Sequence, residues 1–214
     1  MMELYTDSSP NGFKATIALA ELGLPYRLRH VRIDQGEHRL PAFLARNPHG
    51  RIPVLVDHET GVTVFESAAI LLYLAEKTGR LLPKAPSQRW AAITWLQFHA
   101  ASMGPMLGQR VHFELADGGA NVAATAHFRQ LSEAALATMD AAWRATPIWP
   151  ATNIPSPTSP ALAGCISRSW SASIFPPGAT WAPGTRAWRP ARPCSWVSHF
   201  PRPPRAPDFD QGTA

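Results

Sequence analysis

Cysteine is absent from the first 142 residues of this 214-residue chain, because both cysteines, Cys165 and Cys194, lie in its last third. The first 142 residues therefore cannot exchange disulfides with thiols of their own. No run reaches the roughly 18 consecutive apolar residues that a membrane-spanning helix needs. The N-terminal stretch "MMELYTDSSPNG" is charged where a signal peptide would be apolar. We therefore expect a cytoplasmic protein without a membrane partner.

Lysine is absent from residues 143–214, which contain seven Arg and two Asp and so account for the whole net charge of +5. The same segment holds 14 of the 22 prolines and six of the eight tryptophans. A disordered basic arm and a nucleic-acid-binding tail are two interpretations of this composition. The scattered arginines argue against nucleic acid, and the tryptophans argue against disorder, since disordered segments are poor in aromatic residues. We expect no nucleic-acid partner.

The pattern of residues 1–81 is that of a mixed α/β domain. Strands are predicted for "ELYTD" and "PYRLRHVRI", with a helix between them that ends at Gly23, and this order indicates a parallel pair. A short helix follows in "EHRLPAFLARNP", then two strands in "GRIPVLVD" and "GVTVFES". The next helix, "ESAAILLYLAEKTG", has Ser67 as its expected N-cap and Gly79 as its C-cap. The order predicts a four-stranded mixed sheet with helices.

The rest of the chain divides into three further parts. Residues 82–89 are the predicted linker, and residues 90–142 show helical periodicity, as expected for the first helices of an all-α domain. Residues 143–214 have no helical or strand period and are expected to be irregular. No histidines form an i, i+4 pair on a predicted helix, so we expect no metal site.

Pro53 interrupts the strand-like stretch "RIPVLV". Proline cannot donate a hydrogen bond to a sheet and is normally found on edge strands or at bulges. A cis peptide after Ile52 would turn the backbone N–H and C=O of Ile52 outward, toward an extended peptide ligand. A trans proline on an edge strand explains the stretch equally well.

Two predicted strand-to-helix junctions place polar side chains where free backbone N–H groups favour anions. At residues 65–67, "FES", Ser67 would bind a carboxylate and Glu66 would accept a hydrogen bond from an amino group. At residues 8–12, "SSPNG", Ser9 and Asn11 would donate hydrogen bonds to an anion. Locally, a plain serine cap and a proline-started helix explain both junctions without a ligand.

The order of "SSPNG", "RIPVLVD" and "FESAAILLYL", followed by helices, resembles the glutathione transferase family over residues 3–142. The stretches "SPNGFK" and "WLQFHAASMGPMLGQRVHF" are similar to the bacterial nu class, whose members are glutathione-dependent disulfide-bond oxidoreductases. The resemblance implies a thioredoxin-like N-terminal α/β domain plus an all-α C-terminal domain, with an irregular C-terminal third in this chain. It also implies a homodimeric enzyme.

The resemblance assigns glutathione-binding roles to particular residues. Glu66 and Ser67 would hold the γ-glutamyl end, and Ile52 before a cis Pro53 would pair with the cysteinyl backbone. His38 stands where similar proteins often have Gln near the glycyl carboxylate.

Ser9 and Asn11 would hydrogen-bond the glutathione sulfur in the family's arrangement. A thiolate there would be stabilised by these donors and by the helix N-terminus. Two glutathione molecules would supply the two electrons that reduce a small disulfide. Conjugation of glutathione to an electrophile and non-catalytic glutathione binding are the alternatives. Tyr5 lies inside the predicted strand and is expected to be a core residue.

The resemblance stops at Trp143, where the family would continue with a segment like "YLAGDEYSIADIA". If one base was lost near Ala142, restoring it and choosing among synonymous codons for residues 143–170 yields such a segment. Residues 178–200 permit a second family-like stretch, and shifted reading of GC-rich codons yields excess Pro, Trp and Arg. We interpret residues 143–214 as a frameshift product that impairs the chain. A genuine replacement tail is the alternative.

Overall fold

The structure, a computed structural model, describes residues 1–145, 179–180 and 189–190, with side chains described over residues 1–142. Two short strands in the second and third ranges, β5 (Ala179–Thr180) and β6 (Arg189–Pro190), pair antiparallel. The expectation that residues 143–214 are irregular is therefore wrong at these two strands, and also at residues 143–145, which are helical. The rest of that segment lies outside the described residues.

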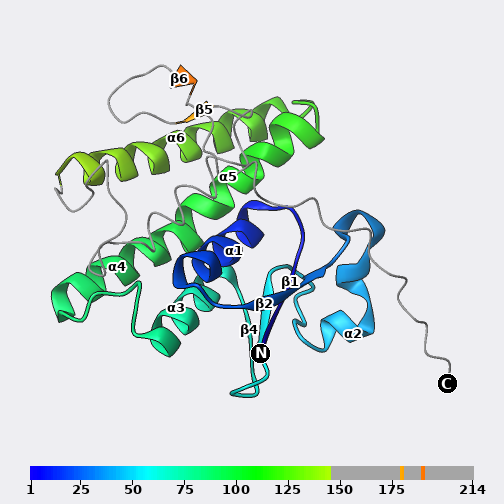
Figure 1. Cartoon of the computed structure of the whole chain (residues 1–214). Helices are drawn as coiled ribbons and strands as arrows, with labels where there is room; N and C mark the ends of the chain where they lie inside the picture. Colours follow the sequence, from blue (N-terminus) through cyan, green and yellow to red (C-terminus); the bar gives the residue numbers. More distant parts are fainter. Residues whose placement is uncertain (146–178, 181–188, 191–214) are drawn as a thin grey trace.

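A four-stranded mixed sheet forms the centre of the N-terminal part (Figure 1). Its strands are β1 (Met2–Thr6), β2 (Tyr26–His30), β3 (Val54–Asp57) and β4 (Val62–Phe65), in the spatial order β2-β1-β3-β4. β1 and β2 are parallel, whereas β3 pairs antiparallel with both β1 and β4. The predicted mixed sheet, with its parallel pair, is confirmed.

Helices cover both faces of this sheet (Figure 1). α1 (Pro10–Leu22) and α3 (Ser67–Thr78) pack against each other on one face. The short α2 (Pro41–Leu44) lies on the other face, after 3₁₀ turns at Ile33–Gln35 and Glu37–Arg39. A small cluster of buried side chains lies beneath α2 and is separate from the main core; its members are Val31, Phe43 and Val54.

The caps of α1 and α3 explain where these helices begin and end. Ser9 caps α1, with its Oγ accepting a hydrogen bond from the Gly12 N–H at 3.0 Å. Gly23 and Gly79 end the two helices in the left-handed conformation, at φ 67° and 64°, which confirms both predicted ends. The prediction of Ser67 as N-cap is wrong by one residue: Ser67 is the first helical residue of α3, and Glu66 holds the cap position.

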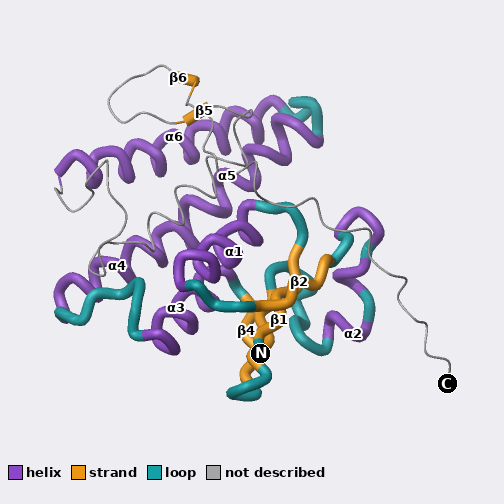
Figure 2. Tube along the Cα trace, in the orientation of Figure 1, coloured by secondary structure: helices purple, strands orange, loops and turns teal. Residues whose placement is uncertain are grey.

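Three helices follow the sheet and lie together on one side of the molecule (Figure 2). They are α4 (Pro86–Phe98), α5 (Gly104–Val111) and α6 (Val122–Ala145). π-helical turns at His99–Met103 and His112–Ala116 follow α4 and α5. One buried apolar cluster extends from the sheet through α1 and α3 into these helices; it includes Met2, Leu19, Leu71, Leu96, Met103 and Met139.

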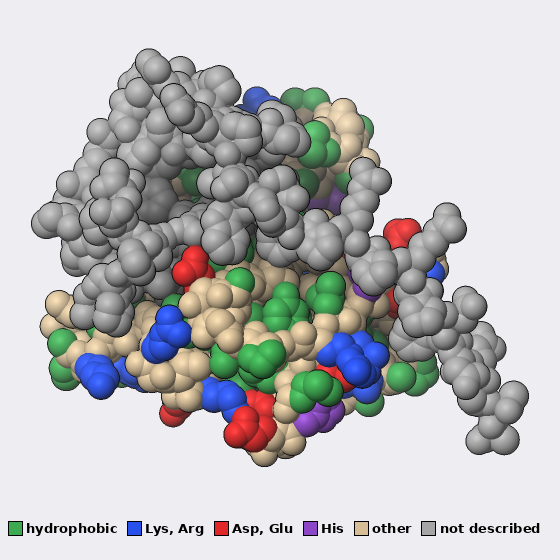
Figure 3. Space-filling view, in the orientation of Figure 1, with side chains coloured by type: hydrophobic (Ala, Val, Ile, Leu, Met, Phe, Trp, Pro, Cys, Tyr) green, Lys and Arg blue, Asp and Glu red, His purple; other side chains and the backbone are tan. Residues whose placement is uncertain are grey.

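The edge strand β2 faces solvent along most of its length. Arg27, Leu28 and Arg29 are exposed, and the two arginines place charge on an edge that is open to pairing with other chains. On the lower part of the face in Figure 3, charged and apolar side chains are interspersed. None of the helices among the described residues has the length and apolarity to cross a membrane.

Candidate functional site

A polar pocket opens where the start of α1, the loop before β3 and the start of α3 meet. Its walls are formed by Asn11, Asn47, Arg51, Ile52, Pro53, Glu66 and Ser67. Five of the seven site residues predicted from the sequence are therefore brought together, although they come from three separate segments. Of the other two, Ser9 lies beside the pocket as the cap of α1, and His38 lies outside its lining.

The peptide bond between Ile52 and Pro53 is cis, which confirms the predicted isomer and excludes the trans alternative. Pro53 is buried directly before β3. The Ile52 side chain is half-buried and packs against the cluster beneath α2. The pocket wall therefore packs at this point against the face of the sheet that α2 covers.

Asn47 holds the loop that leads into the cis peptide. It is 1% exposed, its Nδ2 donates to the Arg51 carbonyl at 2.6 Å, and its Oδ1 accepts from the His49 N–H at 3.0 Å. Gly50 in the same loop has a φ of 65°, and a Cβ there would meet the His38 carbonyl oxygen at 3.1 Å. This arrangement leaves Arg51 exposed at the pocket. Sequence analysis missed both Asn47 and Arg51.

Glu66 and Ser67 lie at the N-terminus of α3. Glu66 is exposed and has a φ of 69°, in the left-handed region that non-glycine residues rarely adopt. Ser67 is 9% exposed and still contributes to the pocket wall. The first N–H groups of a helix, together with its dipole, favour an anion at this end. The junction can therefore receive a carboxylate beside Ser67 and an ammonium group beside Glu66.

Ser9 and Asn11 flank the N-terminus of α1. The Ser9 Oγ already accepts a hydrogen bond from Gly12, so its own hydrogen remains for donation to another group. Asn11 is exposed, and its Oδ1 accepts a hydrogen bond from the Nζ of Lys14 at 2.7 Å. Both side chains are thereby able to act as donors at the end of the pocket next to α1.

Lys14 is a further residue of this site that sequence analysis missed. It is 3% exposed, and its Nζ also donates to the Ser67 Oγ at 3.2 Å. Burial lowers the Lys14 pKa to about 8, and the Glu66 carboxylate acts in the opposite direction. Burial, followed by the charge of Lys14, lowers the pKa of His99 to about 3. The available signal was the position of Lys14 four residues before the buried Ala18, on the inner face of α1.

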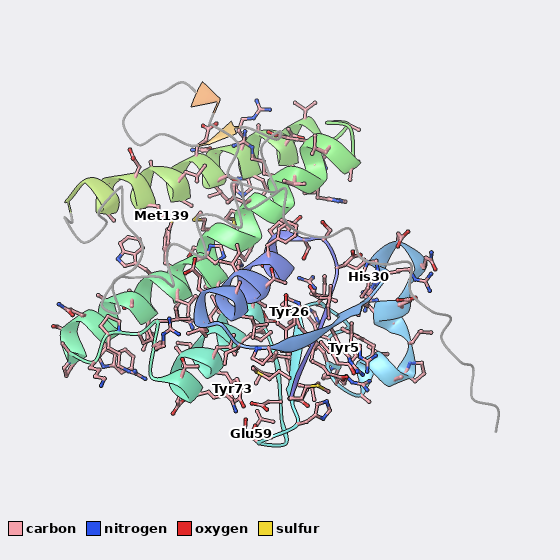
Figure 4. All side chains as sticks on the ribbon, viewed as in Figure 1. Tyr5, Tyr26, His30, Glu59, Tyr73 and Met139 are labelled. Carbon is pink, nitrogen blue, oxygen red and sulfur yellow. The ribbon has the colours of Figure 1, made fainter. Side chains whose placement is uncertain are left out.

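His38 and Tyr5 lie outside this arrangement. His38 is half-buried in the turn before α2, and its Nδ1 has no hydrogen-bond partner in the described part of the chain. Its role at a glycyl carboxylate therefore stays a prediction. Tyr5 lies in β1, donates to Glu3 Oε2 at 2.9 Å and packs beneath the Arg46 guanidinium, 4.8 Å from the ring centre (Figure 4). The expectation of a core residue is met only in part, since Tyr5 is half-buried at the edge of the cluster beneath α2.

Residues 8–77, which include every residue that lines the pocket, match a family model for the glutathione S-transferase N-terminal domain. A crystal structure of a glutathione transferase from Pseudomonas putida, with one glutathione disulfide bound per subunit, superposes with a TM-score of 0.71. It is 31% identical, and the match covers 79% of this chain and 73% of that one. The chain belongs to the glutathione transferase family.

Two curated relatives of this chain have names that state different functions. Disulfide-bond oxidoreductase YfcG of Escherichia coli is 44% identical over 118 residues, which is 53% of this chain and 55% of that protein. Transcriptional regulator URE2 of Saccharomyces cerevisiae is 40% identical over 113 residues, which is 50% of this chain and 32% of that protein. The chain thus spans about half of the first relative and a third of the second.

Proposed function

We propose that this protein is a glutathione-dependent disulfide-bond oxidoreductase that uses the thiol of bound glutathione in place of a protein cysteine. The observation that supports this most is the pocket, in which Asn11, Ile52, Glu66 and Ser67 surround one polar space. The name of the E. coli relative and the glutathione disulfide in the P. putida structure agree with it.

In this proposal each wall of the pocket binds one part of glutathione. Ser67 and the start of α3 bind the γ-glutamyl carboxylate, and Glu66 accepts a hydrogen bond from the α-amino group. The backbone of Ile52 pairs with the cysteinyl residue, which directs the sulfur toward Ser9 and Asn11. His38 lies near the glycyl carboxylate in the same proposal.

The reaction proceeds by two thiol–disulfide exchanges. The thiolate of the first glutathione attacks a sulfur of a small disulfide, forms a mixed disulfide and releases one thiolate, which takes a proton from water. A second glutathione thiolate attacks the glutathione sulfur of the mixed disulfide and releases the second thiol. Two glutathione thiols are oxidised to glutathione disulfide, and one substrate disulfide is reduced to two thiols.

A double variant, Ser9→Ala with Asn11→Ala, tests the sulfur site. Turnover of 2-hydroxyethyl disulfide at fixed glutathione should fall about 100-fold, since two donors that keep the glutathione sulfur ionised as the attacking thiolate are removed. The matched control is Asn121→Ala, because Asn121 caps α6 through the Ala124 N–H at 3.1 Å, far along the chain from the pocket. Unchanged turnover in a folded double variant would refute the assignment.

Assays on the same purified protein distinguish two other functions from disulfide reduction. Conjugation of glutathione to an aryl halide, without reduction of the disulfide, would identify an ordinary transferase. Retention on immobilised glutathione without turnover of either substrate would identify a non-catalytic binding protein. The yeast relative is named a transcriptional regulator and not an enzyme. Fold alone does not decide among these three, because one scaffold serves several functions.

We further propose a homodimer in the cytoplasm and a division into a glutathione-binding domain (1–81), a linker (82–89) and the first helices of an all-α domain (90–142). The predicted end of the linker is four residues too late, because α4 already begins at Pro86. The family resemblance supports the dimer, and the change from sheet to helices supports the division. The mass of the protein in solution, measured by light scattering, tests the dimer.

A further inference from the structure

Lys14 forms hydrogen bonds with a side chain at each end of the candidate pocket. It lies in α1, and its Nζ is 2.7 Å from Asn11 Oδ1 and 3.2 Å from Ser67 Oγ. Asn11 and Ser67 come from segments 56 residues apart, and both line the pocket. A lysine that is 3% exposed is rare, because burying an ammonium group is costly unless hydrogen bonds compensate.

The chemistry of lysine fixes the orientation of the Asn11 amide. A protonated lysine has three donors and no acceptor, so only the amide oxygen of Asn11 can face it. The Asn11 NH₂ group is then directed away from Lys14 and remains available to a ligand in the pocket. Its hydrogens suit a group that only accepts, such as a thiolate.

The same reasoning applies to Ser67. Its Oγ accepts a hydrogen bond from Lys14, so the hydroxyl hydrogen must point to another acceptor. At the N-terminus of α3 that acceptor would be a ligand carboxylate, because the helix N-terminus favours the same charge. One buried ammonium group therefore makes donors of both pocket side chains that it touches.

We propose that Lys14 is a positioning residue that orients Asn11 and Ser67 as donors, so that the pocket selects a ligand with a thiolate and a carboxylate at the spacing of these two side chains. The assignment of the two anions to glutathione rests on the proposed function, whereas the orientation of Asn11 does not. The positive charge of Lys14 adds a general attraction for both anions. Two titratable groups interact with the Lys14 charge: Glu66, at the start of α3, raises the pKa of Lys14, and Lys14 lowers the pKa of His99, in the π-helical turn after α4.

Lys14→Met tests this proposal, because methionine keeps most of the side-chain volume but has no donor. The affinity of the full chain for glutathione at pH 7 should fall at least about 10-fold, as expected for the loss of charge-assisted hydrogen bonds. The affinity for S-methylglutathione, which keeps the carboxylate but has no thiol, should fall by a smaller factor. The pKa of the bound glutathione thiol, followed by thiolate absorbance, should rise by about one unit.

Two further variants distinguish the positioning role of Lys14 from a general effect of the substitution on protein stability. Thr16→Val removes another buried polar group of α1, whose Oγ1 donates only to the Phe13 carbonyl at 3.1 Å, and should leave both affinities and the thiol pKa unchanged. If Lys14→Met does not fold, Lys14→Gln serves instead. Glutamine both donates and accepts, so it cannot fix the amide of Asn11, and we expect the same rise in thiol pKa. An unchanged thiol pKa in a variant that binds glutathione would overturn the proposal.

A measurement without ligand distinguishes failure of this inference from failure of the proposed function. In the free protein, the Asn11 side-chain NH₂ should give a rigid NMR signal that becomes mobile in Lys14→Met and stays rigid in Thr16→Val. If the wild-type chain binds no glutathione, the proposed function fails and this signal still decides the role of Lys14. A signal of equal rigidity in Lys14→Met would overturn the positioning role.

Discussion

Asp57, at the end of β3, shows how single buried polar residues are stabilised in this fold. It is 1% exposed and accepts hydrogen bonds from the Tyr73 hydroxyl at 2.6 Å and from the Glu59 N–H at 3.0 Å, with the Lys77 Nζ at 2.9 Å. Figure 4 labels Tyr73 and Glu59. Burial alone would raise the pKa of Asp57, but these bonds outweigh it and lower the pKa to about 2. The ionised carboxylate is therefore part of the native packing.

Tyr73→Phe should lower the free energy of unfolding by about 1–3 kcal/mol at pH 7, because a buried carboxylate loses a donor. The folded pKa of Asp57 lies below its ordinary value of 3.8, so its stabilisation is present above about pH 4 and is lost as the pH falls toward 2. Urea denaturation at pH 7 and pH 2.5 should show a smaller difference between the two proteins at the lower pH.

Tyr26→Phe is the matched control for this prediction. Tyr26 is half-buried in β2, and its hydroxyl has no hydrogen bond recorded within the described residues. Its removal should change the free energy of unfolding by less than about 0.5 kcal/mol. Equal effects of the two substitutions would show that the bond to Asp57 adds no stability.

At the scale of elements, the start of α1 is fixed by its close approach to the end of β1. A Cβ on Gly12 would lie 2.3 Å from Thr6 Oγ1 and 2.7 Å from the Asp7 carbonyl oxygen. The helix can begin here only because residue 12 has no side chain. Asn11, the adjacent residue, owes its position in the pocket to this contact.

Gly12→Ala should therefore displace the first turn of α1 and lower glutathione affinity at least about 10-fold, with a loss of stability of about 1–3 kcal/mol. Calorimetric titration and urea denaturation measure the two effects. Gly108→Ala is the control, since nothing lies within 4 Å of a Cβ at this position in α5, and alanine there should add about 0.5–1 kcal/mol. Unaltered affinity in Gly12→Ala would show that this contact does not set the pocket.

The sequence was sufficient to predict the elements but not all of their junctions. Alternation and helical periodicity identified the four strands and the main helices. The proline in "RIPVLV" left the cis and trans isomers open, and the family resemblance favoured the cis peptide that the structure has. That Ser67 is the first helical residue of α3 and not its N-cap could not be predicted, because its Oγ bonds to Lys14, 53 residues away in the sequence. Asn47 was missed for a similar reason, since a loop asparagine shows its role only through the carbonyl that it holds.

At the scale of the whole molecule, the two halves depend on one core. Ala135 and Met139 of α6 are buried in the same cluster as Leu4 of β1 and Leu71 of α3. A change in the chain from Trp143 onward, in the last turn of α6, therefore bears on the core of the whole protein. For this reason we propose that the frameshift inferred for residues 143–214 lowers the stability of the protein.

A chain with the reading frame restored after Ala142 should unfold at a temperature at least about 5 °C higher than the chain as written, because more apolar surface is buried. It should also show higher disulfide reductase turnover per molecule. Calorimetry and the disulfide assay test this, and a version truncated after residue 142 serves as the control. A cooperative transition and full activity in the chain as written would identify residues 143–214 as a genuine tail.

The most direct test of the central claim is an NMR titration of the full chain with glutathione. We predict saturable shifts that are confined to the pocket and include the backbone N–H groups of Ile52 and Ser67 and the side-chain amide of Asn11. The absence of saturable shifts would contradict the account. Shifts centred instead on Thr60, in the turn before β4, and on Tyr73, in the middle of α3, would contradict it as well.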